Sequence, residues 1–577
     1  MHTIQIIFDF FQILIFFIVL TIVIKPLGIY CASVYDGKPL FLDPLLRPIE
    51  RFFYKLSGIY PEKEMDWKEY SKSLFVFNGI GLFFLFLLLM FQHYLPLNPQ
   101  HAKGFPFWSA VNIAVSYVTN TNWQIFTGET AISYFTQLAG FTLQSFLSAA
   151  TGISVAISLI RGFARRSSGT IGNFWVDVTR SVLYVLLPIS FIAAIVLLSQ
   201  GVIQNFSPAI QTTMIQAGLP QIIPMGPVAS QEAIKLVGTN GGGVFSANSS
   251  HPYENPTPMS NIVEIFLILI IPATLTYTFG YMIKDTRQGW AIYSVILVIF
   301  LFFTSIFYVS EAAGNPLVTK LGVSGPNMEG KEVRFGLAGT TLFTTATTAT
   351  SCGAVNAMHD SLTPLGGMVP MVLMLLGEVV FGGAGSGLYT MLAFVVIAVF
   401  VAGLMIGRTP EYIGKKVEVF EIRMAVVAVL TSGLVVLIML IITLSSKAGI
   451  NSLINPGPHG LSEIIYAFAS SANNNGSAFA GLNTNTGYYK IALALSMFIG
   501  RYVPVAAIIA MAGSFAKKKY VPPGYGTLPT HGVSFMFWHI LVIMIIGVLT
   551  FSPTLALGPG VEQLMMTGSQ GCPFPGS

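Results

Sequence analysis

The sequence predicts an all-α polytopic membrane protein with ten transmembrane helices. Of its 577 residues, 53% are hydrophobic and only 9% are charged, whereas soluble domains carry about 25% charged residues. Apolar stretches of about 20 residues, the length needed to cross a bilayer, recur along the whole chain. Four short polar loops recur between them. We place the ten spans at about 4–24, 73–93, 134–160, 180–199, 261–283, 290–310, 368–406, 422–445, 487–512 and 533–552.

The N-terminal span lacks a basic leader and an obvious small-residue cleavage site, so we interpret it as a retained anchor helix rather than a signal peptide. The eight middle spans form four pairs, which we name repeats 1 to 4. We divide the chain into an anchor helix with a cytoplasmic loop at 1–72, repeats 1 to 4 at 73–160, 161–283, 284–406 and 407–512, and a C-terminal helix with a tail at 513–577.

The basic residues predict the orientation of the spans. Most of the 29 lysines and arginines lie in alternate loops, at about 25–72, 161–180, 284–287, 408–423 and 517–519. Loops rich in lysine and arginine face the cytoplasm. Both termini are then expected outside, on the same side as the four polar loops. The net charge of +5 reflects this distribution and does not indicate nucleic-acid binding.

Each repeat contains a short apolar segment that is followed by a polar loop. The segments, at about 106–118, 229–237, 338–349 and 461–472, are too short to cross the membrane. We expect each to be a helix whose C-terminal dipole end faces inward and favours a cation. We name the loops polar loops 1 to 4: Thr-Asn-Thr-Asn-Trp-Gln at 119–124, Gly-Thr-Asn-Gly-Gly-Gly at 238–243, Thr-Ser-Cys-Gly-Ala-Val-Asn at 350–356 and Asn-Asn-Asn-Gly-Ser-Ala-Phe at 473–479.

The composition of the polar loops predicts a site for a monovalent cation. Asn122, Gly241, Gly353 and Gly476 occupy matching places. Glycine permits backbone angles that aim carbonyl groups at an ion, and asparagine tolerates positive φ better than most residues. The loops contain no acidic residue, although a calcium or magnesium site would want carboxylates. Ordinary turns of similar composition are the alternative, but four loops in register favour one ring of carbonyls around potassium.

The seventh span is too long for one plain helix, and it contains Phe-Gly-Gly-Ala-Gly-Ser-Gly at 381–387. Glycine costs about 1 kcal/mol relative to alanine inside a helix. We therefore expect half-helices at about 368–380 and 388–406, joined by an intramembrane loop that acts as a gate below the ion site. Close packing of small residues against a neighbouring helix is the alternative. The expected gate residues are Gly382, Gly383, Gly385 and Gly387.

Two charged residues lie inside predicted spans. Glu378 precedes the glycine-rich break, and Arg501 lies in the second span of repeat 4. Charges at membrane depth are costly and usually pair with one another or line water. We expect Glu378 and Arg501 to line a polar exit toward a partner subunit, with a purely structural ion pair as the alternative.

Over essentially its whole length the chain resembles the potassium-binding A subunits of the bacterial potassium-transporting P-type ATPases, the Kdp system. The resemblance rests on the polar loops and on Leu-Pro-Leu-Asn-Pro-Gln at 95–100, Ala-Asn-Ser-Ser-His-Pro-Tyr-Glu-Asn-Pro-Thr at 247–257 and Leu-Pro-Thr-His-Gly at 528–532. It implies a subunit of the potassium-transporter superfamily in the bacterial inner membrane, which binds K⁺ from outside. It places the ion filter at Thr121, Asn122, Gln124, Asn240, Gly241, Cys352, Gly353, Asn475 and Gly476.

The resemblance also implies partners: an ATP-hydrolysing pump subunit, an accessory single-span subunit and a small single-span peptide, all surrounded by lipid. The chain lacks the Asp-Lys-Thr-Gly phosphorylation motif of such pumps and has no phosphate-binding loop of the Gly-Lys-Ser/Thr type. We therefore expect no catalytic residue and no bound nucleotide. The chain would be part of an enzyme only as a non-catalytic subunit beside its pump partner.

Two other functions remain open at this stage. A self-standing potassium channel or an ion-coupled symporter of the same superfamily would have the same loops. A secondary transporter with broken helices would explain the seventh span, but it would show two matching breaks rather than four matching loops.

Overall fold

The computed structural model describes all residues except 1, 217, 378, 523, 525–526 and 569–577. Within this part of the chain, ten helical segments are long and apolar enough to cross a membrane, which confirms the expected number. They are Ile7–Tyr35, Trp67–Tyr94, Thr136–Ala164, Phe174–Ser199, Pro258–Met282, Thr286–Lys320, Ser386–Ile406, Val419–Leu444, Gly487–Lys517 and Val533–Gly568.

Several of these segments combine more than one helical element. Short π-helical stretches at Thr136–Thr142, Ser181–Leu186 and Ala556–Gly560 join or precede α-helices. The α-helices of the spans are α1 (His2–Tyr35), α3 (Trp67–Phe91), α6 (Leu143–Ala164), α7 (Phe174–Arg180), α8 (Leu187–Ser199), α10 (Pro258–Met282), α11 (Thr286–Ala312), α15 (Ser386–Ile406), α16 (Val419–Leu444), α19 (Gly487–Lys517), α20 (Val533–Leu555) and α21 (Val561–Gly568).

The four repeats form a closed ring of helices. Each contains a buried short helix between its two spans: α4 (Phe107–Val118), α9 (Val228–Val237), α13 (Gly336–Ala349) and α18 (Pro458–Ala472). Helix α6 of repeat 1 contacts α9 of repeat 2, α10 contacts α13 of repeat 3, α15 contacts α16 of repeat 4, and α19 contacts α4 and α6 of repeat 1. Helices α1 and α20 pack outside this ring, against α10 and α11 respectively.

Helix α1 is longer than the predicted first span, because it continues through Lys25 and Pro26 to Tyr35. Membrane helices tolerate proline when neighbouring helices support the local backbone. Helix α10 packs closely against this part of α1: Thr278 Oγ1 donates to the Gly28 backbone oxygen at 3.3 Å, and a Cβ atom built on Gly28 would lie 2.9 Å from the ring of Tyr277. The end of the hydrophobic stretch therefore did not mark the end of the helix.

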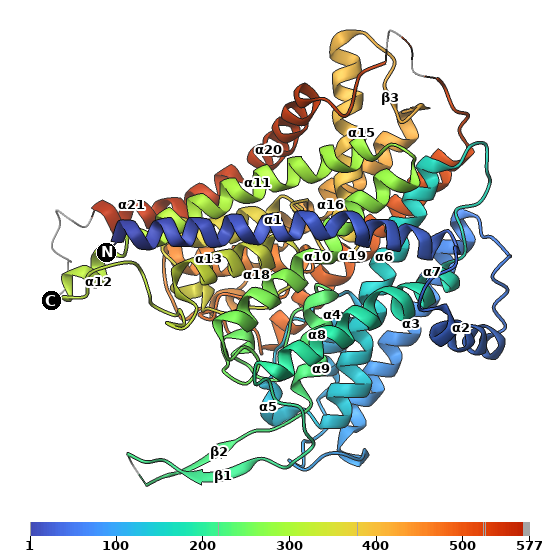
Figure 1. Ribbon diagram of the computed structural model, residues 1–577. Coiled ribbons are helices and arrows are strands. Elements are labelled where there is room, and N and C mark those ends of the chain that lie inside the picture. The colour runs from blue at the N-terminus through green and yellow to red at the C-terminus, as the bar shows by residue number, and fades with distance from the viewer. Residues whose placement is uncertain (1, 217, 378, 523, 525–526, 569–577) are drawn as a thin grey trace.

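The remaining elements are shorter than the spans. Helix α2 (Asp43–Ser57) exposes an apolar face, and a hairpin of β1 (Ile210–Thr213) and β2 (Pro220–Ile223) projects from the body (Figure 1). The other elements are α5 (Gly128–Ala131), α12 (Pro316–Lys320), α14 (Pro364–Leu375), α17 (Lys447–Ile450), the antiparallel pair β3 (Glu411–Tyr412) and β4 (Lys415–Lys416), and 3₁₀ turns at Gln92–Tyr94, Asn248–Ser250 and His359–Ser361.

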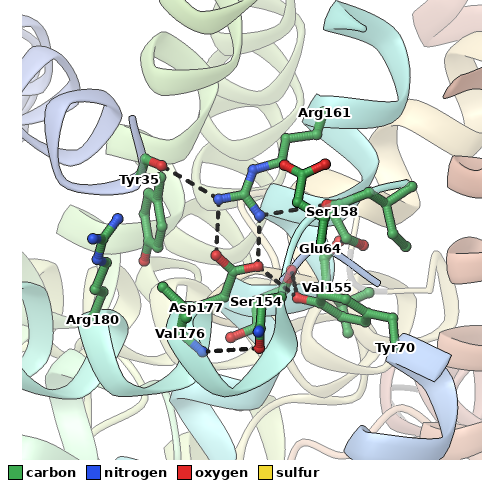
Figure 2. Close-up of polar contacts among 12 residues, drawn as sticks. Tyr35, Glu64, Tyr70, Ser154, Val155, Ser158, Arg161, Val176, Asp177 and Arg180 are labelled. Carbon is green, nitrogen blue, oxygen red and sulfur yellow. Dashed lines mark hydrogen bonds and ion pairs between the residues drawn. The ribbon is translucent and has the colours of Figure 1, made fainter. Parts of the chain in front are cut away.

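A buried ion pair joins α6 to α7 at the end of α6 away from the polar loops. Figure 2 shows Arg161 and Asp177 facing each other through two contacts, of 2.6 Å and 2.8 Å. The Tyr70 hydroxyl donates to Asp177 Oδ2 at 3.0 Å and to the Ser154 oxygen at 2.9 Å. Arg161 also donates to the Tyr35 backbone oxygen at 3.4 Å. This cluster ties α1, α3, α6 and α7 together.

The basic loops predicted for one side of the membrane pack against one another. Ser167 N donates to the Lys518 oxygen at 3.1 Å, and Lys518 Nζ donates to the Lys416 oxygen at 2.8 Å. Lys415 Nζ donates to the backbone oxygens of Gly162 at 2.7 Å and Phe515 at 2.5 Å, and also to that of Arg165. Lys415 thus occupies the C-terminal ends of α6 and α19, where helix dipoles favour a cation.

Candidate functional site

The four polar loops share positive φ at two matching positions. In each, the residue four positions beyond the end of the short helix has positive φ: Asn122 at 52°, Gly241 at 79°, Gly353 at 73° and Gly476 at 104°. The expectation of matching places is therefore confirmed in backbone angles. The residue two positions earlier also has positive φ in every loop, at Asn120, Thr239, Ser351 and Asn474.

This second set of positions escaped the sequence analysis, because its members are not glycines. Positive φ is unfavourable for a β-branched residue such as Thr239, and strained backbone of this kind clusters at functional sites. Between the two positive-φ positions the chain returns to negative φ. Alternation of hand turns successive carbonyl groups toward the same side, whereas an extended strand points them to opposite sides.

One backbone hydrogen bond recurs in all four loops and fixes their start. The N–H group of the residue before the Asn or Gly position donates to the carbonyl five residues earlier, inside the short helix. The pairs are Thr121 to Ser116 at 2.9 Å, Asn240 to Lys235 at 2.8 Å, Cys352 to Thr347 at 3.0 Å and Asn475 to Ser470 at 2.8 Å.

The loops approach each other in cyclic order. A Cβ atom on Gly241 would overlap the backbone oxygen of Cys352 in polar loop 3, and one on Gly353 would overlap that of Asn475 in polar loop 4. A Cβ atom on Gly476 would overlap the backbone oxygen of Thr121 in polar loop 1. Glycine is required at these three places because each abuts the next loop.

Polar loop 1 differs because its matching residue carries a side chain. Asn122 Nδ2 donates to the Gly241 backbone oxygen at 3.0 Å and to Ser145 Oγ at 3.4 Å. Gln124 makes a second link between the same loops, because its Nε2 donates to the Gly243 oxygen at 2.8 Å. The contact from polar loop 1 to polar loop 2 is thus made by amide side chains, and it is the fourth contact of the ring.

Two other predicted filter residues, Asn240 and Asn475, anchor their loops through side-chain hydrogen bonds. Asn240 Nδ2 donates to Asn120 Oδ1 at 2.5 Å and to Ser148 Oγ at 3.1 Å. Asn475 Nδ2 donates to the Thr347 oxygen of α13 at 2.9 Å. All nine predicted residues therefore lie on the four loops that meet, and except for the partly exposed Gln124 and Gly476 they are buried.

A buried charged cluster behind polar loop 2 was missed in the sequence. Lys235 Nζ lies 2.7 Å from Glu232 Oε2, 2.7 Å from Glu254 Oε2 and 3.0 Å from Asn248 Oδ1. Glu254 Oε1 accepts from Phe245 N at 2.8 Å, and Asn248 Nδ2 donates to the Gly242 oxygen. These carboxylates bind the lysine and the loop backbone.

The predicted break in the seventh span is present, but it begins earlier than expected. The first half-helix, α14, ends at Leu375 rather than near residue 380, and α15 begins at Ser386 rather than at residue 388. Gly387, predicted as a loop residue, lies in the first turn of α15, where a Cβ atom would overlap the Phe381 oxygen. The positive φ of Gly377 and the capping of α15 by Gly385 explain the shifted ends.

The described residues of the loop at 376–385 contact repeats 1 and 2 and the end of α13 in their own repeat. Ala384 N donates to Thr239 Oγ1 of polar loop 2 at 2.8 Å, and Gly382 N donates to the Ala349 oxygen, at the end of α13, at 3.1 Å. A Cβ atom on Gly385 would overlap the backbone of Gly152 in α6. In the same region, the Arg501 guanidinium of α19 lies 3.0 Å from the Cβ position of Gly152. The loop therefore lies beneath the ring of polar loops.

Arg501 lines a small cavity beside this loop. The cavity lies between α15, α16, α18 and α19, and its polar lining includes Thr390, Ser432, Asn473 and Asn474. Glu378, the predicted partner of Arg501, lies outside the described residues. The predicted pairing of the two charges therefore stays a prediction.

Eight spans around four re-entrant loops define a channel-like membrane protein with pseudo-fourfold architecture. A solved structure with the same fold is that of the potassium transporter TrkH from Vibrio parahaemolyticus, with a TM-score of 0.54 over 85% of this chain and 98% of that chain, at 13% identity. The sequence profile of the family described as Potassium-transporting ATPase A subunit matches residues 14–564. The chain belongs to this family.

Curated relatives have similar length. The potassium-transporting ATPase potassium-binding subunit of Geobacter sulfurreducens is 57% identical over 97% of this chain and 100% of its own length. The protein of the same name from Hydrogenobaculum sp. is 55% identical over 97% of this chain and 98% of its own length.

Proposed function

We propose that this chain is the potassium-binding subunit of an ATP-driven potassium importer. The ring of polar loops binds K⁺ through backbone carbonyls and passes it to a separate pump subunit that hydrolyses ATP. The names of the curated relatives support this function. The observation that carries it is the cyclic contact of four loops that share positive φ at two matching positions.

Carbonyl rings replace the hydration shell of a monovalent cation. The C-terminal ends of α4, α9, α13 and α18 come directly before the loops, so their dipoles lower the energy of a cation in the ring. The filter comprises the nine residues predicted from the sequence, with Thr121, Asn240, Cys352 and Asn475 supplying equivalent carbonyls. We extend this set by Thr239, which also supports the loop beneath.

Below the ring, the loop at 376–385 is the gate, formed by Gly382, Gly383 and Gly385, with Gly387 packing behind it. It blocks a straight path and directs the ion sideways into the polar cavity beside Arg501. Buried charges at membrane depth usually line such paths. Glu378 belongs to the same exit path in this proposal.

The assembly comprises the pump subunit, an accessory single-span subunit and a small single-span peptide in the bacterial inner membrane. The basic loops that pack together face the cytoplasm, and both termini face outward. ATP binds to the pump subunit and not to this chain, which has neither a phosphorylation motif nor a phosphate-binding loop.

The test uses the complex purified from its native membrane and reconstituted in vesicles. ATP-dependent ⁸⁶Rb⁺ or K⁺ uptake, with a phosphorylatable partner subunit present, is the expected result. Uptake that persists without ATP and without the partner would favour the self-standing channel or symporter. Gly241→Asp or Gly353→Asp should alter ion selectivity, and unchanged K⁺ and Rb⁺ binding in both variants would remove the filter assignment.

A further inference from the structure

A histidine and three carboxylates meet on the polar-loop side of the molecule, away from the ring. His459 and Glu463 lie one turn apart in α18, Asp360 lies in the 3₁₀ turn that follows polar loop 3, and Glu562 lies in the first turn of α21. These residues come from repeats 3 and 4 and from the C-terminal segment, so neither spacing nor motif revealed them in the sequence.

The two ring nitrogens of His459 have separate partners. Nδ1 lies 2.7 Å from Glu562 Oε1, whereas Nε2 faces Asp360 Oδ1 at 3.1 Å and Glu463 Oε1 at 3.9 Å. A metal-binding histidine commonly donates its other N–H group to a carboxylate, which fixes the ring. Here Glu562 is the carboxylate that fixes the ring through Nδ1, and Nε2 is free to bind a metal ion together with the facing carboxylates.

The separations suit a divalent transition metal. Ligand atoms about 2.0–2.1 Å from a tetrahedral ion lie about 3.3 Å from each other. The distances from Nε2 to the carboxylate oxygens of Asp360 and Glu463, 3.1 Å and 3.9 Å, lie on either side of that value, so a small movement of the Glu463 side chain would complete the geometry. Nitrogen and carboxylate oxygen together favour ions such as Zn²⁺ or Mn²⁺ over Ca²⁺, which prefers oxygen ligands alone.

A second observation points to a missing positive charge. Glu463 is fully buried, its Oε1 accepts from Asn455 Nδ2 at 2.7 Å, and its Oε2 has no hydrogen-bond partner. Among the described residues, no lysine or arginine forms an ion pair with Asp360, Glu463 or Glu562. Three carboxylates thus exceed the single positive charge that a protonated His459 could supply, and an unpartnered buried carboxylate is costly.

We propose that His459 Nε2, Asp360 and Glu463 bind one divalent transition-metal ion of the Zn²⁺ or Mn²⁺ type, with Glu562 as the positioning residue. The ion fastens α21 to the outer ends of repeats 3 and 4. The His459 ring lies nearly parallel to that of Phe479 in polar loop 4, with centroids 5.9 Å apart, and Phe479 stacks on Tyr466 at 4.3 Å. The site is therefore connected to polar loop 4 through aromatic side-chain contacts.

The experiment measures binding of Zn²⁺, and separately of Mn²⁺, to the tag-free purified complex after removal of metal with EDTA. Calorimetry should give one equivalent per chain for at least one of the two ions. His459→Gln and Asp360→Asn should weaken binding at least tenfold, and Glu562→Gln should weaken it about 10- to 100-fold. His101→Gln, at an exposed histidine of another loop on the same side, is the matched control and should bind like the wild type.

Two further variants distinguish a metal site from an ion-paired imidazolium. His459→Cys retains a metal ligand and should keep Zn²⁺ binding, whereas His459→Lys retains a positive charge and should lose it. Protection of α21 from hydrogen exchange should increase with metal in the wild type and His459→Cys only. If the wild type binds neither ion more tightly than His459→Lys does, with both proteins melting normally, the proposal is wrong and His459 serves as a charged bridge.

Discussion

Gly476 in polar loop 4 lies directly against the backbone oxygen of Thr121 in polar loop 1, although 355 positions separate them in the chain. This contact joins the last repeat to the first and closes the ring of loops. The same relationship holds between Gly241 and Cys352 and between Gly353 and Asn475, so the ring depends on the absence of side chains at three places.

Replacing Gly476 with alanine should therefore disrupt the ring. The new Cβ atom would overlap the Thr121 oxygen, and φ of 104° is unfavourable for alanine. We expect at least a tenfold loss of apparent K⁺ affinity in ⁸⁶Rb⁺ competition uptake. Gly457→Ala is the matched control, because Gly457 also has positive φ, at 79°, but has open space around it. Equal losses in both variants would attribute the effect to backbone strain alone.

Asn122→Ala should weaken K⁺ binding by removing the amide that donates to the Gly241 oxygen. A lost hydrogen bond of this kind costs about 1 kcal/mol, which corresponds to roughly a fivefold change in affinity. Asn122→Gly removes the same bond but relieves the positive φ, so it should be the milder variant. Binding isotherms for K⁺ and Rb⁺ measure the effect, and a stronger defect in Asn122→Gly would contradict this account.

Thr239→Val should loosen the connection between polar loop 2 and the loop beneath it. Valine leaves the buried Ala384 N–H group without its acceptor, at a cost of about 1–3 kcal/mol. We expect more ATP-independent ⁸⁶Rb⁺ leak in reconstituted vesicles. Thr239→Ser keeps the hydroxyl and should stay tight. A leak of equal size in the serine variant would show that the Thr239 hydroxyl does not keep the gate closed.

Lys415→Met should destabilise the side of the protein opposite the polar loops. The side chain is buried, and its ammonium group contacts three carbonyl oxygens at the ends of α6 and α19. Hydrogen bonds to charged groups contribute about 1.5–3 kcal/mol each, so the melting temperature should fall by several degrees. Lys416→Met changes the exposed neighbour and should have little effect on the melting temperature. A similar fall in the melting temperature of this control would show that the carbonyl contacts of Lys415 are not the cause.

The stability of the protein should fall in acid because of His359. This residue lies outside the membrane-spanning segments, and burial, followed by the nearby Lys331 charge, lowers its pKa to about 3. An unfolded histidine has a pKa of about 6.5. As the pH falls from 6.5 toward 3 the unfolded chain binds a proton that the folded chain does not, and stability decreases by up to about 1.4 kcal/mol per pH unit.

Melting curves of the wild type and His359→Gln between pH 7 and pH 4 measure this effect. Glutamine does not titrate and retains a polar group for the Tyr466 hydroxyl, which His359 Nδ1 contacts at 2.7 Å. The wild type should lose stability relative to the variant as the pH is lowered. A constant difference across this range would contradict the lowered pKa.

Hydropathy and local composition were sufficient to predict ten spans, four short helices and four polar loops. Each of these features depends on a short stretch of neighbouring residues and on the membrane, which forces long apolar stretches to become helices. The predicted ends of α1 and α14 were wrong, because packing between helices rather than hydropathy decides where those helices end. Glycines in the sequence indicated where one loop packs against the next. The positive φ of Thr239 and Ser351 could not be predicted, because these residue types rarely adopt it.

Contacts between distant segments were decided only in the tertiary structure. The closure from Gly476 to Thr121, the position of Lys235 between two glutamates, and the meeting of His459 with Asp360 and Glu562 all join separate helices. Local pattern determines which segments enter the membrane, because burial of apolar residues acts on each segment by itself. The relative placement of those segments depends on side-chain packing between them, and it is this packing that brings four ordinary polar loops into one ring.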